Sequence, residues 1–186
     1  EASITGTSVV TSAGVISVRA DDTSSILAEL LAASLAAGGG GGASVQVAIS
    51  ATVAENTIGS TLLATIENST VNAGGSITVK AFSDTAINAF GQAVGVAAGG
   101  AGGVSVNVSG SGVVASNTTT NSIEASIFGS TVNSGGNITV DADDLSDILA
   151  VLTAVSISAG GAGTASINVT FALTKADNSI GSALLA

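Results

Sequence analysis

The sequence predicts an all-β protein, a parallel β-solenoid (β-helix) made of about three tandem repeats of 61 residues. The first observation is the stretch STVNAGGSITVKA at residues 69–81, which returns as STVNSGGNITVDA at residues 130–142. The second is the alternation of β-branched and polar residues within each copy, as in the ITVKA segment. The third is the glycine pairs that interrupt these runs. A fixed period of this kind indicates a stacked repeat architecture.

The repeat boundaries are approximately 1–62, 63–123 and 124–184, and we expect one solenoid segment, 1–186, that continues in a longer array. A looser copy of the organising stretch, TSVVTSAGVISVRA, occupies residues 7–20. The first repeat carries one extra residue, so positions before about Ala13 align at a spacing of 62. On this alignment Val9 shares a column with Val71 and Val132.

Stacking would place equivalent residues directly above one another, because one repeat cannot bury its own apolar faces or pair its own strand edges. We expect aliphatic columns to fill the interior, and an asparagine column in a turn to hydrogen-bond from layer to layer. The predicted structural ladders are Val18/Val79/Val140, Val45/Val106/Ile167 and Asn56/Asn117/Asn178. Columns of Ala, Gly and Ser would let two sheets approach closely.

The segment 84–98 has two interpretations. Its counterpart in the first repeat, TSSILAELLAASLAA, has the composition of a capped helix. The second copy contains Gly91 and Gly95, which are poor in helix interiors. Because the repeats should share one conformation, we expect a long strand with a kink near Ala93. This strand is apolar on both faces, as is typical of a strand that is covered on both sides.

The number of coils in a repeat is left open by the sequence. Glycine pairs precede strand-like runs at two places in each repeat, and either place is suitable for the start of a coil. One wide coil predicts a rise of about 5 Å per repeat, and two coils predict about 10 Å.

The composition excludes most enzyme chemistry, and we expect no catalytic residues and no enzyme. The chain has no His and no Cys, hence no imidazole base, no thiolate and no usual zinc ligand set. It has only three basic residues and a net charge of −10, which opposes binding to nucleic acid. The longest apolar run, residues 26–37, contains Glu29 and is too short for a membrane span.

The repeat pattern resembles the repeat regions of large bacterial filamentous adhesins and autotransporter passengers with β-solenoid shafts. The likeness is carried by STVNAGGSITVKA, by the GGAGGVSVNV run at residues 99–108 and by the IGS-type turn at Ile58. It covers the whole chain. The resemblance implies an exported, elongated, non-enzymatic shaft at the cell surface or outside a bacterial cell, and it supplies no catalytic residues.

Five carboxylates are candidates for Ca²⁺ ligands contributed by neighbouring layers: Asp21, Asp22, Asp84, Asp143 and Asp144. The alternative is a solvated corner at which the acids cap strand ends. The calcium-binding nonapeptide GGxGxDxUx is absent, because Val104-Ser105-Val106 follows GGAGG without an Asp. No other cofactor is expected.

Two functions fit these observations. The first is a structural module of an extracellular fibre, whose partner is the protein itself through end-to-end stacking and lateral apolar contacts. The second is an adhesin shaft that displays a binding face for a host, a carbohydrate or another cell. Carbohydrate-binding faces usually have columns of aromatic residues, but here Phe82, Phe90, Phe128 and Phe171 fall in four different columns.

Overall fold

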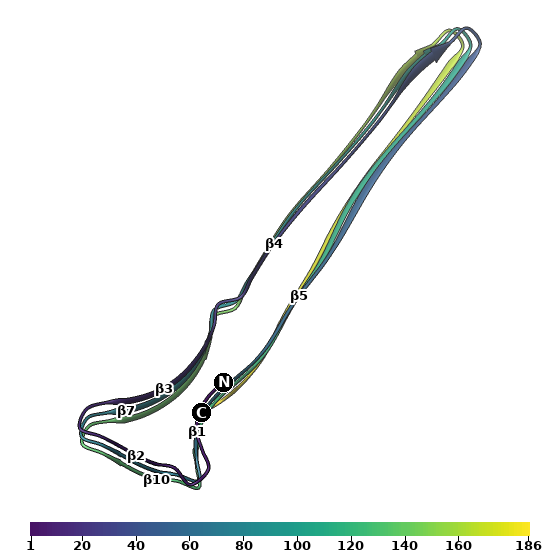
Figure 1. The fold of residues 1–186 in the computed structure, drawn as a ribbon. Coiled ribbons are helices and arrows are strands. Elements are labelled where there is room, and N and C mark those ends of the chain that lie inside the picture. The colour runs from purple at the N-terminus through teal and green to yellow at the C-terminus, as the bar shows by residue number, and fades with distance from the viewer.

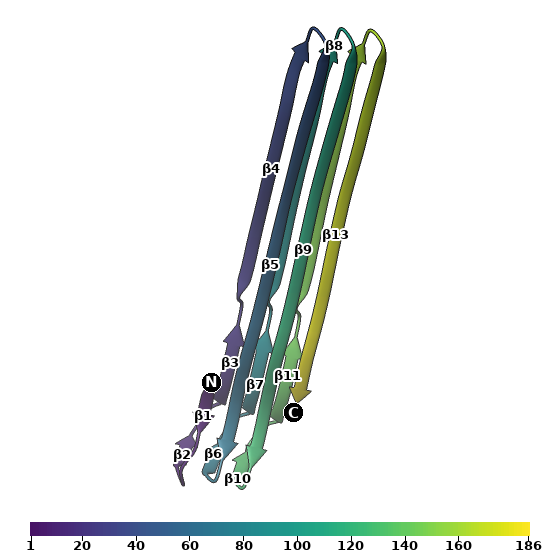
Figure 2. The ribbon, with the colours of Figure 1, turned by 90° about the vertical axis from the view of Figure 1, so that its right-hand side faces the viewer.

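The computed structural model describes all residues 1–186 and is a parallel β-solenoid of thirteen strands, with no helix. Every strand pairs in parallel with its equivalents in the neighbouring repeats, as Figure 2 shows from the side. Each repeat makes one wide coil, because Val79 is the Cα partner of both Val18 and Val140. One repeat therefore adds a single layer, with a rise of about 4.8 Å. The predicted fold class is confirmed.

Each coil has a three-sided base and a long two-layered arm (Figure 1). Three strand types belong to the base: β1 (Ala2–Ile4); β2 (Val9–Ser12), β6 (Thr70–Ala73) and β10 (Thr131–Ser134); and β3 (Ile16–Asp22), β7 (Ile77–Ser83) and β11 (Ile138–Asp144). One side of the arm is formed by β4 (Ser25–Gly40), β8 (Ala86–Ala101) and β12 (Asp147–Ala162). The other side and the base share β5 (Ala43–Glu67), β9 (Val104–Phe128) and β13 (Ala165–Leu185). We define the arm as residues 25–53, 86–114 and 147–175.

The four sheets have the strand orders β1-β5-β9-β13, β10-β6-β2, β11-β7-β3 and β12-β8-β4. The chain reverses direction at the tip of the arm, in the glycine-rich turn between β4 and β5. We call the junction between β3 and β4, with its equivalents, the neck. There the chain steps sideways before it enters the arm (Figure 1).

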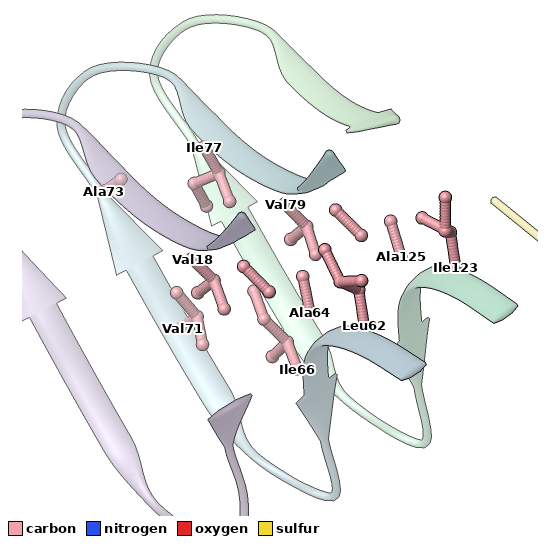
Figure 3. Close-up of a cluster of buried hydrophobic side chains, with 12 residues drawn as sticks. Val18, Leu62, Ala64, Ile66, Val71, Ala73, Ile77, Val79, Ile123 and Ala125 are labelled. Atoms are coloured by element: carbon pink, nitrogen blue, oxygen red, sulfur yellow. The ribbon is translucent and has the colours of Figure 1, made fainter. Parts of the chain in front are cut away.

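The apolar core lies in the base, where the alternating residues of three strands point toward one another (Figure 3). Ile66, Ile77 and Val79 are fully buried there. The predicted Val18/Val79/Val140 ladder packs in this core, with Val140 at its margin. Each middle-layer side chain is covered by its equivalents above and below, so burial is most complete in the second coil.

Residues 84–98 confirm the strand interpretation, since β8 runs without interruption from Ala86 to Ala101 and has no kink at Ala93. The Leu- and Ala-rich counterpart in β4 is also extended, because pairing with β8 overrides its helical composition. Gly95 explains the close approach of the two layers of the arm. A Cβ built on Gly95 would lie 2.5 Å from the carbonyl oxygen of Gly110 on β9.

The prediction that the spacing stays at 62 up to about Ala13 is wrong, because the extra residue of the first repeat lies earlier in the chain. Ile4 does pair with Ile66 at a spacing of 62, but Val9 pairs with Thr70, and Val10 pairs with Val71. The insertion therefore lies in the turn between β1 and β2, where Gly6 and Thr7 have φ values of 76° and 62°. A turn with positive φ accommodates one more residue without moving the strands on either side of it.

The predicted Val45/Val106/Ile167 ladder exists, but the prediction that it fills the interior is wrong. Its members are in register on β5, β9 and β13. Val45 is nevertheless 67% exposed, whereas its neighbour Ser44 is buried. In this part of the sheet the hydroxyl column faces inward, so the valine column faces outward.

Candidate assembly surfaces

The asparagine ladder runs along the stack, as predicted. Asn56 Nδ2 donates to Asn117 Oδ1, and Asn117 Nδ2 donates to Asn178 Oδ1, both at 2.8 Å. The predicted location in a turn is wrong, because all three residues lie within the long strands β5, β9 and β13 and point inward. The ladder ties adjacent layers together where the arm meets the base.

Two further asparagine ladders were not predicted. Asn107 Nδ2 donates to Asn168 Oδ1 at 3.0 Å inside the arm, and Asn133 Nδ2 donates to Asn72 Oδ1 at 2.8 Å on the outside of the base. The signal was present in the sequence as Asn residues 61 positions apart. It was obscured in the first repeat, where Gln46 and Thr11 occupy these columns.

The two end layers leave strand edges without partners. At one end β1, β2, β3 and β4 are the outermost strands, and at the other end β10, β11, β12 and β13 are. Inward-facing residues of the last layer are open as a result: Ile180 is 51% exposed, although its equivalent Ile58 is buried. A further coil placed on this end would pair the edge and cover the side chain.

The arm carries large apolar side chains on both outer surfaces. We call the outward side chains of β4, β8 and β12 the β8 face. Its exposed large apolar members are Leu27, Leu31, Leu35, Phe90, Leu149, Val151, Val155 and Ile157. We call the outward side chains of the arm parts of β5, β9 and β13 the β9 face, with Val45, Val47, Ile49, Val53, Val104, Ile167, Val169, Phe171 and Leu173 exposed. The prediction that β8 and its equivalents are covered on both sides is therefore wrong.

The inside of the arm is lined mostly by small and polar side chains, with larger apolar ones such as Ile87 and Val113 near the neck. Ala89, Ala93 and Ala97 of β8 point inward and are buried, and they face the buried Ser109 and Ser111 of β9. Beyond the neck the arm has only two charged side chains within residues 26–53, 87–114 and 148–175, namely Glu29 and Lys175. The outer surfaces of the arm thus carry mainly apolar side chains, and its interior is lined mostly by small or polar ones. An exposed apolar area of this extent is typical of an interaction surface.

The five calcium candidates are distributed over separate places. Asp21 pairs with Arg19 at 2.7 Å, and Asp143 pairs with Lys80 at 2.5 Å, both on the outside of the base. The main-chain N–H of Asp84 donates to the carbonyl oxygen of Asp22 in the turn after β7. No group of three carboxylates is close enough to hold a metal ion.

Lys80 links the second layer to the third. Its Nζ donates to Asp141 and Asp143 at 2.6 and 2.5 Å, and it lies 5.5 Å from the ring centroid of Phe82. These hydrogen bonds raise the pKa of Lys80, and the one to Asp143 lowers the pKa of that carboxyl group. The pairs lie at the surface and are partly exposed, so they contribute little to stability.

Asp22 and Asp144 occupy equivalent positions at the neck, where hydroxyl groups surround them. Asp22 Oδ1 accepts from the main-chain N–H and the hydroxyl of Ser24 at 3.0 and 2.5 Å, and Asp22 also accepts from the hydroxyl of Ser60 on β5. These bonds, led by the one from Ser24, lower the pKa of Asp22. They tie the end of β3 to the opposite strand and close the neck.

The neck is built in the same way in the third coil. Burial acts to raise the pKa of Asp144, but hydrogen bonds from Ser146, Ser182 and Asn121 outweigh it, and the pKa is lowered. In the second coil Ser83 replaces the aspartate, and Asn121 Nδ2 bridges to it at 3.0 Å. Each coil therefore has its own polar closure at the neck.

Acidification is expected to weaken the neck. Because the folded-state pKa values of Asp22 and Asp144 lie below the ordinary value, the unfolded chain binds more protons, and stability falls as the pH drops below about 4. The double variant Asp22→Asn/Asp144→Asn should melt at a lower temperature at pH 7 and lose less on going from pH 5 to pH 3. Thermal melts by circular dichroism measure both effects, with Glu67→Gln/Glu124→Gln as the control. An unchanged pH dependence in the neck variant would contradict this.

One shallow hollow lies on the β8 face, lined by Glu29, Leu30, Leu31, Phe90 and Gln92. The other hollows lie at the base, one beside Glu67 and Glu124 and one at the turn before β6. No helix in the structure has the length and hydropathy needed to cross a membrane.

Known proteins provide no further assignment. No protein-family model matches the chain, and neither the curated proteins nor the solved structures give a match. What the structure establishes is the class of fold, a parallel β-solenoid with one coil per 61-residue repeat.

Proposed function

We propose that the chain is a structural repeat module of an extracellular or cell-surface fibre of bacterial origin, with other copies of itself as its partner. The observation that carries this proposal is the continuous residue-on-residue register of all four sheets, with unpaired edges at both end layers. Parallel coils with this register extend by adding one layer at a time. Backbone pairing, aliphatic columns and asparagine ladders would then continue across each junction.

The proposed mechanism is mechanical: the fibre acts through its length and stiffness. Lateral contacts between the apolar outer faces of the arms would join fibres side by side. No aromatic platform supports the alternative of a displayed binding face. The four Phe residues lie apart, with Phe82 and Phe128 at the base and Phe90 and Phe171 on opposite faces of the arm.

Electron microscopy of the purified chain tests the proposal. We expect filaments with a layer spacing of about 4.8 Å along their axis, which is the rise of one coil. An Ile180→Lys variant should form far shorter filaments, because its ammonium group would be enclosed by the next coil, where an unpaired charge is costly. Leu185→Lys places the same charge on the outside of the same strand and should leave filament length unchanged. Particles of one size at high concentration would refute the fibre.

A further inference from the structure

The β8 face carries larger side chains near the neck than at the tip of the arm, although the column Leu35/Val96/Ile157 near the tip is also large. Near the neck, one column is formed by Leu27, Asn88 and Leu149. Near the tip, the corresponding column contains only Ala37, Ala98 and Ala159, and the next outward column contains only glycine. The outer surface is therefore raised at the neck and low at the tip.

We propose that this face packs against the β8 face of a second copy, with the tips of the two arms pointing in opposite directions. This inference rests on the proposed function and specifies its lateral contact. In that arrangement Leu27 lies against Ala37 of the second copy, and Leu31 lies against its Ala33. Larger residues then meet smaller ones at these two pairs of columns, and between them Phe90 lies against Val96 of the second copy. Sheets that pack face to face in this way lie about 10 Å apart.

The position of the base favours opposite tips. Strand β5 runs straight from the tip into the base, whereas the base projects on the side of β4 (Figure 1). Two β8 faces with tips in the same direction would bring the two bases together and hold the arms apart. With opposite tips, each arm lies alongside the other and ends beside the other's base.

The area of the contact is sufficient for a stable pair. Each arm strand on this side has 16 residues, and three strands lie side by side. The face is therefore about 50 Å long and about 14 Å wide, or roughly 750 Å² in each copy. Standard protein interfaces bury about 800 Å² per partner. The central strand, β8, contributes Phe90, and aromatic residues are enriched at interface cores.

Electrostatics does not oppose the pair. The β8 face has two charged residues: Asp147, the first residue of β12, and Glu29, which lies in the other outer layer beside the hollow. With opposite tips, the two Glu29 residues are offset by about 20 Å along the arms, well beyond the screening length of about 8 Å. The β9 face is less suitable, because Phe171 stands over Gly110 and the Lys175–Asp177 pair lies at its lower end.

The pairing is compatible with fibres of any length. Its two-fold axis runs along the stack, so the first coil of one copy meets the first coil of the other, and so on through the layers. Two parallel stacks therefore join arm to arm over their whole length, and every added coil adds about 250 Å² to the contact in each stack.

A matched pair of variants tests which face is used. Leu31 on the β8 face is 76% exposed and Val53 on the β9 face is 73% exposed, so glutamate at either position leaves the core intact. We expect wild-type filaments to have twice the mass per unit length of a single stack, one 17.4 kDa chain per three layers. Leu31→Glu should halve this value, and Val53→Glu should leave it unchanged. Single stacks in the wild type, or halving by Val53→Glu alone, would overturn the proposal.

Cysteine crosslinking with a short bis-maleimide tests the direction of the arms, on a background without any cysteine. The reagent is needed because sheets about 10 Å apart are too distant for a direct disulfide. Leu31→Cys and Ala33→Cys chains, mixed before assembly and treated with the reagent, should yield a crosslinked heterodimer at a higher level than either chain alone. The mixture Leu31→Cys with Val53→Cys is the control and should give none. Absence of the first product in paired filaments would overturn the opposite-tip arrangement.

A failure of the arm contact can be distinguished from a failure of the proposed fibre. If the chain forms no filaments, the fibre proposal fails, and the arm contact is then measured as a dimer by light scattering, again with Leu31→Glu and Val53→Glu. Monomers in that measurement, or wild-type chains that float with phosphatidylcholine vesicles instead of pairing, would overturn the arm contact itself.

Discussion

Ile77→Ala is expected to lower the free energy of unfolding by about 2–5 kcal/mol, the usual cost of removing a large aliphatic side chain from a close-packed core. Ile77 is fully buried in the middle layer of the base, between Ile16 and Ile138. Its neighbours belong to stacked strands whose positions are fixed by pairing, so they cannot move in to fill the cavity. Denaturant unfolding followed by circular dichroism measures the change.

Ile138→Ala is the matched control for this effect. The residue occupies the same column and differs only in its layer, since the third coil has no strand above β11 and Ile138 is 47% exposed. In the unassembled chain, for which both variants are measured below the concentration at which filaments form, the same substitution should cost less than half as much, because less buried apolar area is lost. Equal losses at the two positions would mean that stacking does not determine burial in the base.

Asn117→Ala is expected to cost about 1–3 kcal/mol, because it removes the centre of a hydrogen-bonded ladder. Asn117 accepts from Asn56 and donates to Asn178, both at 2.8 Å, and its side chain is fully buried. The substitution leaves the buried amide group of Asn56 without its partner. The same denaturant experiment measures the loss.

Asn133→Ala breaks an equivalent interlayer bond on the outside of the base, where water replaces the lost partner. Asn133 donates to Asn72 at 2.8 Å and is exposed. This control should cost less than about 0.5 kcal/mol, as is usual for surface substitutions. If both variants lost a similar free energy of unfolding, burial of the hydrogen bonds would not be what makes the Asn117 ladder stabilising.

The candidate surfaces were partly predictable. The apolar character of both faces of segment 84–98 was predictable, but the structure leaves the outer face exposed and adds a second exposed apolar surface on the other side of the arm. The role of Asp22 was not predictable, because Ser60, which donates to it, is 38 residues away in the chain. No local pattern relates two residues that meet only when the arm closes on itself.

The sequence by itself determined which residues stack. Equivalent side chains such as Val79 and Val140 recur at a constant spacing, and parallel pairing turns that spacing into a vertical register. Alternation along a strand shows that neighbours point to opposite sides, but it does not show which side is inside. Only the tertiary structure decided this for Val45 and Ser44, because Ser44 lies where glycines of the facing layer bring the two layers of the arm close together, and the valines were left outside.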